Sequence, residues 1–251
     1  MQNCRLLFIP VTVLTLILSP YARVPLHAAA GDLDPTFGIG GIVTTDFGSS
    51  TDDAQEVVIQ PDGKIVAGGT RGLDFAVARY NTDGSLDATF GTGGLVVTDL
   101  YGGSYDIAGA VALQPDGKIV LAGQTRTPAS PVTDQDFALV RYNSDGSLDS
   151  TFGTGGIVRT DFGSPNDEGA VSVAIDSVGR IVAVGSTYTL FSPGGRDFAV
   201  ARYNPDGTLD TTFDGDGRVI SINTPNFDGA VDVSIQADDR IVVLGLSLIH
   251  I

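Results

Sequence analysis

The sequence predicts an all-β protein, a β-propeller built from four-stranded antiparallel blades. Three observations support this fold class. The phrase Leu-Asp-x-Thr-Phe begins at residues 33, 86, 148 and 209, which gives a repeat of roughly 60 residues. Apolar residues alternate with a period of two in short runs, as in strands, and no helical period occurs. Turn sequences rich in Asp and Gly separate these runs, as is typical of hairpins.

Composition narrows the class of protein. The chain has 251 residues, of which 42% are hydrophobic and 33 are glycine, so a packed globular core is expected rather than disorder. The net charge is −16. Such an acidic surface repels nucleic acid phosphates and anionic lipid headgroups. We therefore expect no nucleic acid partner.

Residues 1–30 have the features of an export signal. Arg5 precedes an apolar stretch over residues 6–18, and residues 28–30 are three alanines, as a signal peptidase site requires. The apolar run is shorter than the ~20 residues of a membrane-spanning helix, and Pro10 interrupts it. This disfavours the alternative of an uncleaved anchor. Cys4 precedes the apolar run, which disfavours a lipoprotein. We expect a secreted or cell-surface protein without stable membrane insertion after signal cleavage.

The first two strands of each repeat form a hairpin. Val57 and Ile59 alternate before a Pro-Asp-Gly turn, and residues 65–67 continue after it as a run that is apolar on both faces. Such a run is expected of a strand covered on both sides. The four turns occupy residues 60–64, 114–118, 176–180 and 236–240, with the Asp-Gly pair lost from the third and fourth.

A third strand is predicted at residues 75–80, with equivalents at 137–142 and 198–203. The loop before it differs in length between repeats, at residues 70–73, 125–135 and 187–196. Insertions at one loop of a repeat indicate that these loops all project from one face. Any ligand specificity is therefore expected in these loops.

The Leu-Asp-x-Thr-Phe linker leads into a fourth strand, such as residues 94–99. A strand of this fourth type is also expected at residues 41–47, before the first complete repeat, where it could complete the final blade. Residues 31–245 thus form the propeller repeats, with starts near 33, 86, 148 and 209. We expect a truncated fragment with three full blades and part of a fourth.

Residues 246–251, Leu-Ser-Leu-Ile-His-Ile, depart from the repeat. They are the translation of CTG TCT CTT ATA CAC ATC, a transposon-end adapter sequence used in sequencing libraries. Our hypothesis is that this tail is encoded by the adapter and is not native protein sequence.

Three motifs in fixed order resemble the delta-60 repeat β-propeller family: Leu-Asp-x-Thr-Phe-Gly-x-Gly-Gly, Gln-Pro-Asp-Gly-Lys-Ile-Val and Asp-Phe-Ala-x-x-Arg-Tyr-Asn-x-Asp-Gly-Ser. The resemblance spans residues 31–245. It implies an exported bacterial repeat propeller, often part of a larger surface or secreted chain. It implies no established activity and no catalytic residues.

Candidate chemistry is limited to carboxylates, tyrosines and hard cations. The histidines, His27 and His250, and the one cysteine, Cys4, all lie in the signal or the suspected tail, which excludes Ser-His-Asp and Cys-His catalysis and the usual zinc ligands. An acid recurs nine positions before the second residue of each hairpin turn, the residue aligned with Pro61. The four acids are Asp52, Asp106, Glu168 and Asp228. They could form a Ca²⁺-binding ring at the channel mouth, or each could cap its own turn. We favour the capping role.

Other repeated residues are predicted to be structural. The set Asn81, Asp83 and Asp87 partly resembles a calcium loop but lacks the distal glutamate of an EF-hand, so turn formation is favoured. Arg79, Arg141 and Arg202 are expected to pair with carboxylates. The expected partners of these arginines are the aspartates at the starts of the third strands, Asp74, Asp136 and Asp197. One phenylalanine per repeat is expected to pack between blades: Phe37, Phe90, Phe152 and Phe213.

These observations predict a binding or structural module with no catalytic activity and no required cofactor, and with a protein or carbohydrate ligand. The alternative is a propeller hydrolase or lyase that uses a divalent cation in its channel.

Overall fold

The computed structural model describes residues 31–103, 105–126, 135–163, 168–188, 196–221 and 228–247. The predicted signal peptide and both histidines lie outside these ranges, and of the suspected tail only residues 246 and 247 lie inside them. Every regular element in the described ranges is a strand. Within them, no helix has the length and apolar character needed to cross a membrane.

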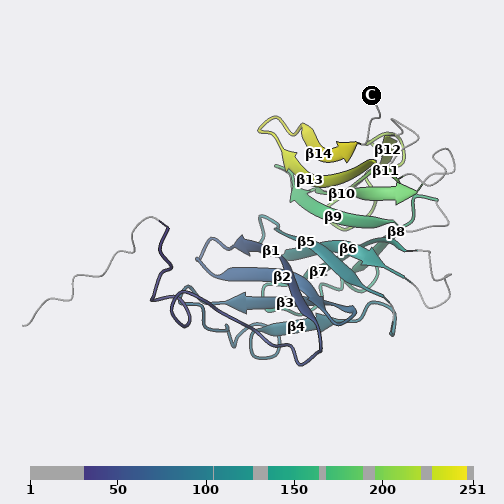
Figure 1. Ribbon diagram of the computed structural model, residues 1–251. Helices are drawn as coiled ribbons and strands as arrows, with labels where there is room; N and C mark the ends of the chain where they lie inside the picture. The colour runs from purple at the N-terminus through teal and green to yellow at the C-terminus, as the bar shows by residue number, and fades with distance from the viewer. Residues whose placement is uncertain are drawn as a thin grey trace, which may run out of the picture.

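The strands form three complete blades and one two-stranded blade (Figure 1). The first blade has β1 (Asp52–Ile59), β2 (Ile65–Arg71), β3 (Asp74–Tyr80) and β4 (Leu95–Thr98). The second has β5 (Ile107–Leu113), β6 (Ile119–Thr125), β7 (Asp136–Tyr142) and β8 (Ile157–Thr160). The third has β9 (Gly169–Ile175), β10 (Ile181–Tyr188), β11 (Arg196–Tyr203) and β12 (Arg218–Ser221). The fourth has β13 (Asp228–Ile235) and β14 (Ile241–Ser247).

Each sheet is an antiparallel meander in chain order. The first strands of successive blades pack on one another, β1 on β5, β5 on β9 and β9 on β13, as the inner strands of a propeller do. The predicted β-propeller, with three full blades and part of a fourth, is confirmed.

The blades stack through faces of opposite shape. In β3, Phe75 and Val77 point toward the second blade and pack in one cluster with Ala138 and Val140 of β7. The alternate residues Ala76 and Ala78 line the opposite face. We call the face that carries Phe75 and Val77 the leading face of the blade, and the face that carries Ala76 and Ala78 the trailing face. Large side chains on one face and alanines on the other explain why the strand is apolar on both sides.

The second interface repeats this arrangement. Phe137 and Leu139 of the second blade pack with Ala199 and Ala201 of the third, and all four side chains are fully buried. Each Phe or Leu that is removed from water in this way stabilises the fold by about 1.5–3 kcal/mol.

A buried hydroxyl pair fixes the outer part of each interface. Tyr142 at the end of β7 is fully buried and shares a 2.8 Å hydrogen bond with Thr98 of β4 in the preceding blade. Tyr203 donates to Thr160 in the same way, at 2.7 Å. Because a buried hydroxyl without a partner is costly, this pair fixes the register of one blade on the next.

The prediction of a strand at residues 41–47 is wrong, because the only pairing there is an isolated bridge between Ile39 and Ile42. The segment nevertheless occupies the place of a fourth strand against the first blade, since Thr45 and Tyr80 share a 2.7 Å hydrogen bond. The ladder is missing because no described strand lies beside it to pair with.

A β-bulge lies opposite the glycine of each second strand. In the second blade Ala108 and Ala110 pair with successive residues of β6, so the backbone crowds Gly123. A Cβ on Gly123 would lie 2.0 Å from the carbonyl oxygen of Ile107. The same approach occurs at Gly69 and Gly185, which explains the glycine that ends each second run.

We predict that Gly123→Ala destabilises the chain by about 3 kcal/mol or more, because the added methyl group meets rigid backbone. The control is Gly155→Ala, where nothing lies within 4 Å of the added Cβ and φ is +65°; its strain costs about 1 kcal/mol. Urea unfolding of both variants measures the difference. Equal losses would contradict the crowding at the bulge.

Candidate functional site at the loop edge of the blades

Two kinds of connection meet at one edge of every blade. One joins the second strand to the third, such as Arg71 to Asp74, and the other joins one blade to the next, such as Thr98 to Ile107. We call this edge the loop edge. The hairpin turns lie at the opposite edge, which we call the turn edge. The described ends of the loops of variable length therefore lie beside the residues that enter each inner strand.

The predicted acids lie at the loop edge and cap their own connections. Asp106 is fully buried and accepts hydrogen bonds from the Leu100 amide at 2.8 Å and the Thr125 hydroxyl at 2.6 Å. Glu168 accepts equivalent bonds from Phe162 and Thr187. Asp52 accepts from the Phe47 amide at 2.9 Å.

Asp228 is also fully buried, and the connection before it lies outside the described residues. The alternative of a ring formed by these four acids has no support among the described residues, where each group of three potential metal ligands contains only one of them.

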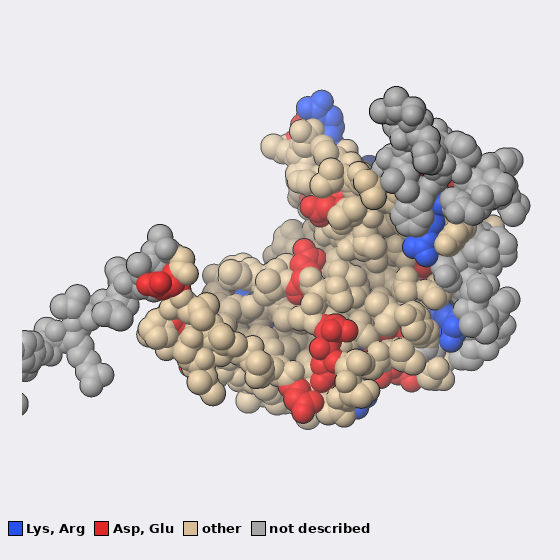
Figure 2. Space-filling model, in the orientation of Figure 1, with Lys and Arg blue, Asp and Glu red and all other residues tan. Residues whose placement is uncertain are grey.

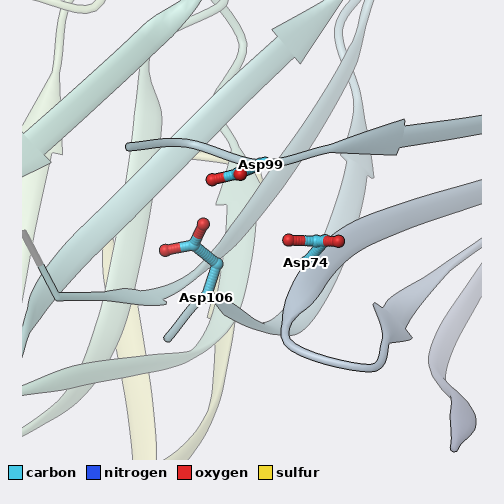
Figure 3. Close-up of side chains that lie close together, drawn as sticks. All are labelled: Asp74, Asp99 and Asp106. Atoms are coloured by element: carbon cyan, nitrogen blue, oxygen red, sulfur yellow. The ribbon is translucent and has the colours of Figure 1, made fainter. Parts of the chain in front are cut away.

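The structure instead groups two of these acids, Asp106 and Glu168, each with two other acids that sequence analysis did not combine. Asp74 at the start of β3, Asp99 after β4 and Asp106 before β5 have carboxylate oxygens within 4.8 Å of one another. Figure 3 shows these three carboxylates directed toward a common point. Asp136, Asp161 and Glu168 form the equivalent group one blade later. The sequence did contain a signal for this grouping, because an aspartate, Asp99 or Asp161, directly follows each of these two fourth strands.

The two groups differ in the arginine that pairs with them. Arg159 of β8 forms an ion pair with Asp136 in the second group. The aligned residue in β4 is Val97, so the first group has no equivalent arginine. Instead Arg71 of β2, whose counterpart in β6 is Thr125, lies 3.6 Å from Asp74. Each group therefore contains one acid paired with an arginine, and the arginine comes from a different strand in the two groups. Clustered carboxylate oxygens of this kind suit a hard divalent cation or a basic side chain.

Asp99 also organises its loop, because its two oxygens accept hydrogen bonds from the amides of Tyr101, Gly102 and Gly103.

Acidic side chains are also spread over the rest of the molecular surface. Figure 2 shows acidic side chains in several separate groups on the face drawn, with the basic side chains nearer its margins.

The arginine pairing expected from sequence was wrong in its partners. Arg79 and Arg141 bond Asp87 and Asp149, each at 2.8 Å, rather than the acids at the starts of the third strands. Arg202 bonds Asp210 in the same way. The linker folds back on the third strand, because the Asp87 amide donates to the Arg79 carbonyl, and so it brings this aspartate beside the arginine.

The phenylalanine of the linker completes this cluster. The Arg79 guanidinium lies 4.5 Å from the ring centroid of Phe90, and Arg141 lies equally far from that of Phe152. Both rings are fully buried, as predicted for an inter-blade core. Phe213 is partly buried, and Phe37 has intermediate exposure.

The set resembling a calcium loop forms turns, as favoured from sequence. Asp83 accepts hydrogen bonds from the amide and hydroxyl of Ser85. Asp87 is held by Arg79 and by the Lys64 ammonium at 2.9 Å. Its oxygens are therefore engaged by protein donors.

These observations define the chain as a β-propeller protein made of tandem blades. Three segments, residues 60–90, 114–152 and 179–213, match the family described as "Domain of unknown function (DUF5122) beta-propeller". Each segment runs from a hairpin turn through the second and third strands to the linker phenylalanine. No curated protein sequence matches the chain.

Among solved structures, the chain is similar to selenomethionine-substituted virginiamycin B lyase from Staphylococcus aureus, with 12% identity and a TM-score of 0.41. The match covers 74% of this chain and 47% of that chain. At this level the similarity carries no information on activity.

The linker aspartates make the fold sensitive to acid. Burial raises the pKa of Asp149, but hydrogen bonds from Thr151 and the charges of Lys118 and Arg141 outweigh it and hold the pKa well below the usual range. A lowered folded-state pKa stabilises the fold above the unfolded-state value of about 3.9. This stabilisation is lost as the pH falls from there toward the folded-state pKa.

We predict that Asp149→Asn costs about 3 kcal/mol at neutral pH, since it leaves Arg141 buried without its ionic partner. The variant should also lose less stability than the parent between pH 5 and about 3. Asp116→Asn, on the exposed turn edge, is the control and should behave like the parent. Urea unfolding across this pH range tests both parts, and a parallel pH dependence in Asp149→Asn would contradict the pairing.

Proposed function

We propose that this protein is an exported binding module, secreted or held at a cell surface, with no catalytic activity of its own. Its ligand contacts the loop edge. The observation that supports this most directly is that the strand ends from which the variable loops leave lie at the same edge as the two groups of three carboxylates. A regular scaffold with variable loops at one edge suits recognition, because the strands hold the loops in place.

The charge of the edge favours a partner with basic or hydroxyl groups, a protein surface or a carbohydrate. Asp99 and Asp161 are exposed and so are accessible to such groups. Carboxylates accept hydrogen bonds from sugar hydroxyls and pair with Lys or Arg. The net charge of −16 adds a long-range attraction for cationic partners, which salt weakens.

The presence of two carboxylate groups also supports a second candidate, a hydrolase or lyase that depends on a divalent cation. Asp74, Asp99 and Asp106 would hold the cation through oxygen ligands, as Ca²⁺ prefers. A bound cation would act as a Lewis acid on the substrate.

We predict that neutralising the loop edge weakens ligand binding more than the same charge change elsewhere. The test variant is Asp99→Asn with Asp161→Asn, and the matched control is Asp62→Asn with Asp116→Asn at the turn edge. Binding of the full chain to immobilised carbohydrates and lysine-rich peptides is measured at low and high salt. We expect about a tenfold loss for the loop-edge pair only. Equal losses of affinity in the two double variants would contradict a ligand site at the loop edge, because they would indicate non-specific charge attraction alone.

The second candidate predicts that CaCl₂ raises the melting temperature of the full chain and that EDTA reverses the rise. Asp99→Asn should abolish the shift, since it removes an exposed ligand. Asp62→Asn is the control and should retain it. A melting temperature unaffected by CaCl₂, MgCl₂, MnCl₂ and EDTA would eliminate the cation-dependent enzyme and leave the binding module intact.

A further inference from the structure

A groove follows the outermost strand of each of the first two blades. In the second blade it lies along β8 and has a volume of about 560 Å³, a size typical of small-ligand sites. Its apolar lining includes Leu100, Ile157 and Val158, and its polar side chains are those of Tyr101, Thr154 and Arg159. The equivalent groove along β4 has a volume of about 640 Å³. We call these two the rim grooves. Both lie among residues of the first three blades and the connections that enter them.

The two rim grooves differ in one pair of side chains. Pairing with the third strands aligns β4 with β8, so Val97 stands where the second groove has Arg159. Gly48 stands where the second groove has Tyr101, since each is the fourth residue of a segment that begins Thr-Asp. The aligned residues in the third blade are Ile220 and Gly163. Side chains that the fold requires recur in successive blades, so a pair that occurs once indicates a role in binding.

The polar groups of this groove keep hydrogen-bonding capacity that the described residues do not use. Arg159 bonds Asp136 through Nε and Nη2, whereas its Nη1 bonds no described residue. The hydroxyls of Tyr101 and Thr154 also have no hydrogen-bond partner in the described part of the chain. Burial raises the pKa of the Tyr101 hydroxyl, so this group is neutral and can both donate and accept.

The charges around the groove favour a neutral ligand. The Asp136 carboxylate is fully buried and balances the charge of the Arg159 guanidinium, with which it forms an ion pair. An anion therefore gains little from Arg159. It is also repelled by Asp161, which is exposed and has a carboxylate oxygen within 4.8 Å of one of Asp136. A cation meets the guanidinium itself. Hydroxyl groups, in contrast, can accept from Arg159 and donate to Asp161.

A sugar ring matches both parts of this lining. Its C–H face is apolar and packs on an aromatic ring, while the hydroxyls around its edge pair with donors and acceptors. Tyr101 lies at the loop edge, and Thr154 lies at the turn-edge end of β8. The strand between them is about 10 Å long, which is longer than one sugar ring. The groove therefore suits more than one sugar.

We propose that the rim groove of the second blade binds a neutral oligosaccharide. The Tyr101 ring packs on the face of one sugar, Arg159 donates to a hydroxyl oxygen, and Thr154 bonds a sugar further along the ligand. This assignment rests on the proposed function, an exported binding module with its ligand at the loop edge. It selects a carbohydrate over a protein as that ligand.

Isothermal titration calorimetry of the full chain with cellohexaose, xylohexaose, maltohexaose and chitohexaose tests the proposal. We expect saturable binding of at least one of them. Tyr101→Ala should weaken that binding by about tenfold or more, because it removes the aromatic surface. Tyr105→Ala changes the same connection outside the groove, so this matched control should bind like the parent. Melting temperatures without sugar show that both variants fold. Equal affinities of the two variants would overturn the proposal.

The repeat supplies a second matched pair. Thr92 and Thr154 line the two rim grooves at equivalent positions, and their amides donate to Leu95 and Ile157 in the same way. Thr154→Val should weaken sugar binding by about threefold to tenfold, because one hydrogen bond is lost. Thr92→Val should leave the affinity unchanged. Equal effects of the two substitutions would contradict the assignment to the second groove.

Failure of this proposal and failure of the proposed function give different results. Sugar affinity that persists in Tyr101→Ala but falls in Asp99→Asn with Asp161→Asn would overturn the groove and leave a ligand site at the loop edge. Affinity that persists in all of these variants would overturn both. Binding of lysine-rich peptides with no binding of the four sugars would show a protein ligand and overturn the oligosaccharide alone.

Discussion

The structure depends most on the arginine that precedes the last residue of each third strand. Arg141 joins four parts of the fold: Asp149 of its own linker, the ring of Phe152, Gln114 of its own hairpin turn and the Pro205 carbonyl of the next blade. A buried guanidinium is tolerated because its donors have partners. Its planar fork can reach several acceptors at once, which a lysine could not do. The same contact therefore folds the linker and attaches the next blade.

Much of the fold could be predicted from the sequence, because period-two runs and Asp-Gly turns are local signals. The hairpin persists where the signal is lost: Asp239 replaces the turn glycine and keeps its positive φ of 61°. The partner of Arg79 was mispredicted, since Asp87 is reached only when the linker folds back. The strand expected before the first blade was also mispredicted, because a ladder needs a neighbouring strand that sequence periodicity alone does not supply.

The candidate site was predictable only in part. The repeated acid before each inner strand was visible in the sequence, and its capping role follows from the short connection that it closes. The grouping of Asp74, Asp99 and Asp106 was not visible, since the three residues come from two blades and meet only when those blades pack. The two groups differ at two positions, Arg159 against Val97 and Arg71 against Thr125, and a search for repeated residues discards both because neither arginine is repeated.

The unlike leading and trailing faces give the stack a polarity. A blade whose leading face carries a phenylalanine and meets a trailing face that carries an alanine can be added in one orientation only, and each new blade presents a surface similar to that of the one before it. Duplication of a whole repeat in the gene therefore creates a unit that already fits both neighbours. Such an architecture can change its number of blades by recombination, while the curvature between neighbours decides which numbers close into a ring.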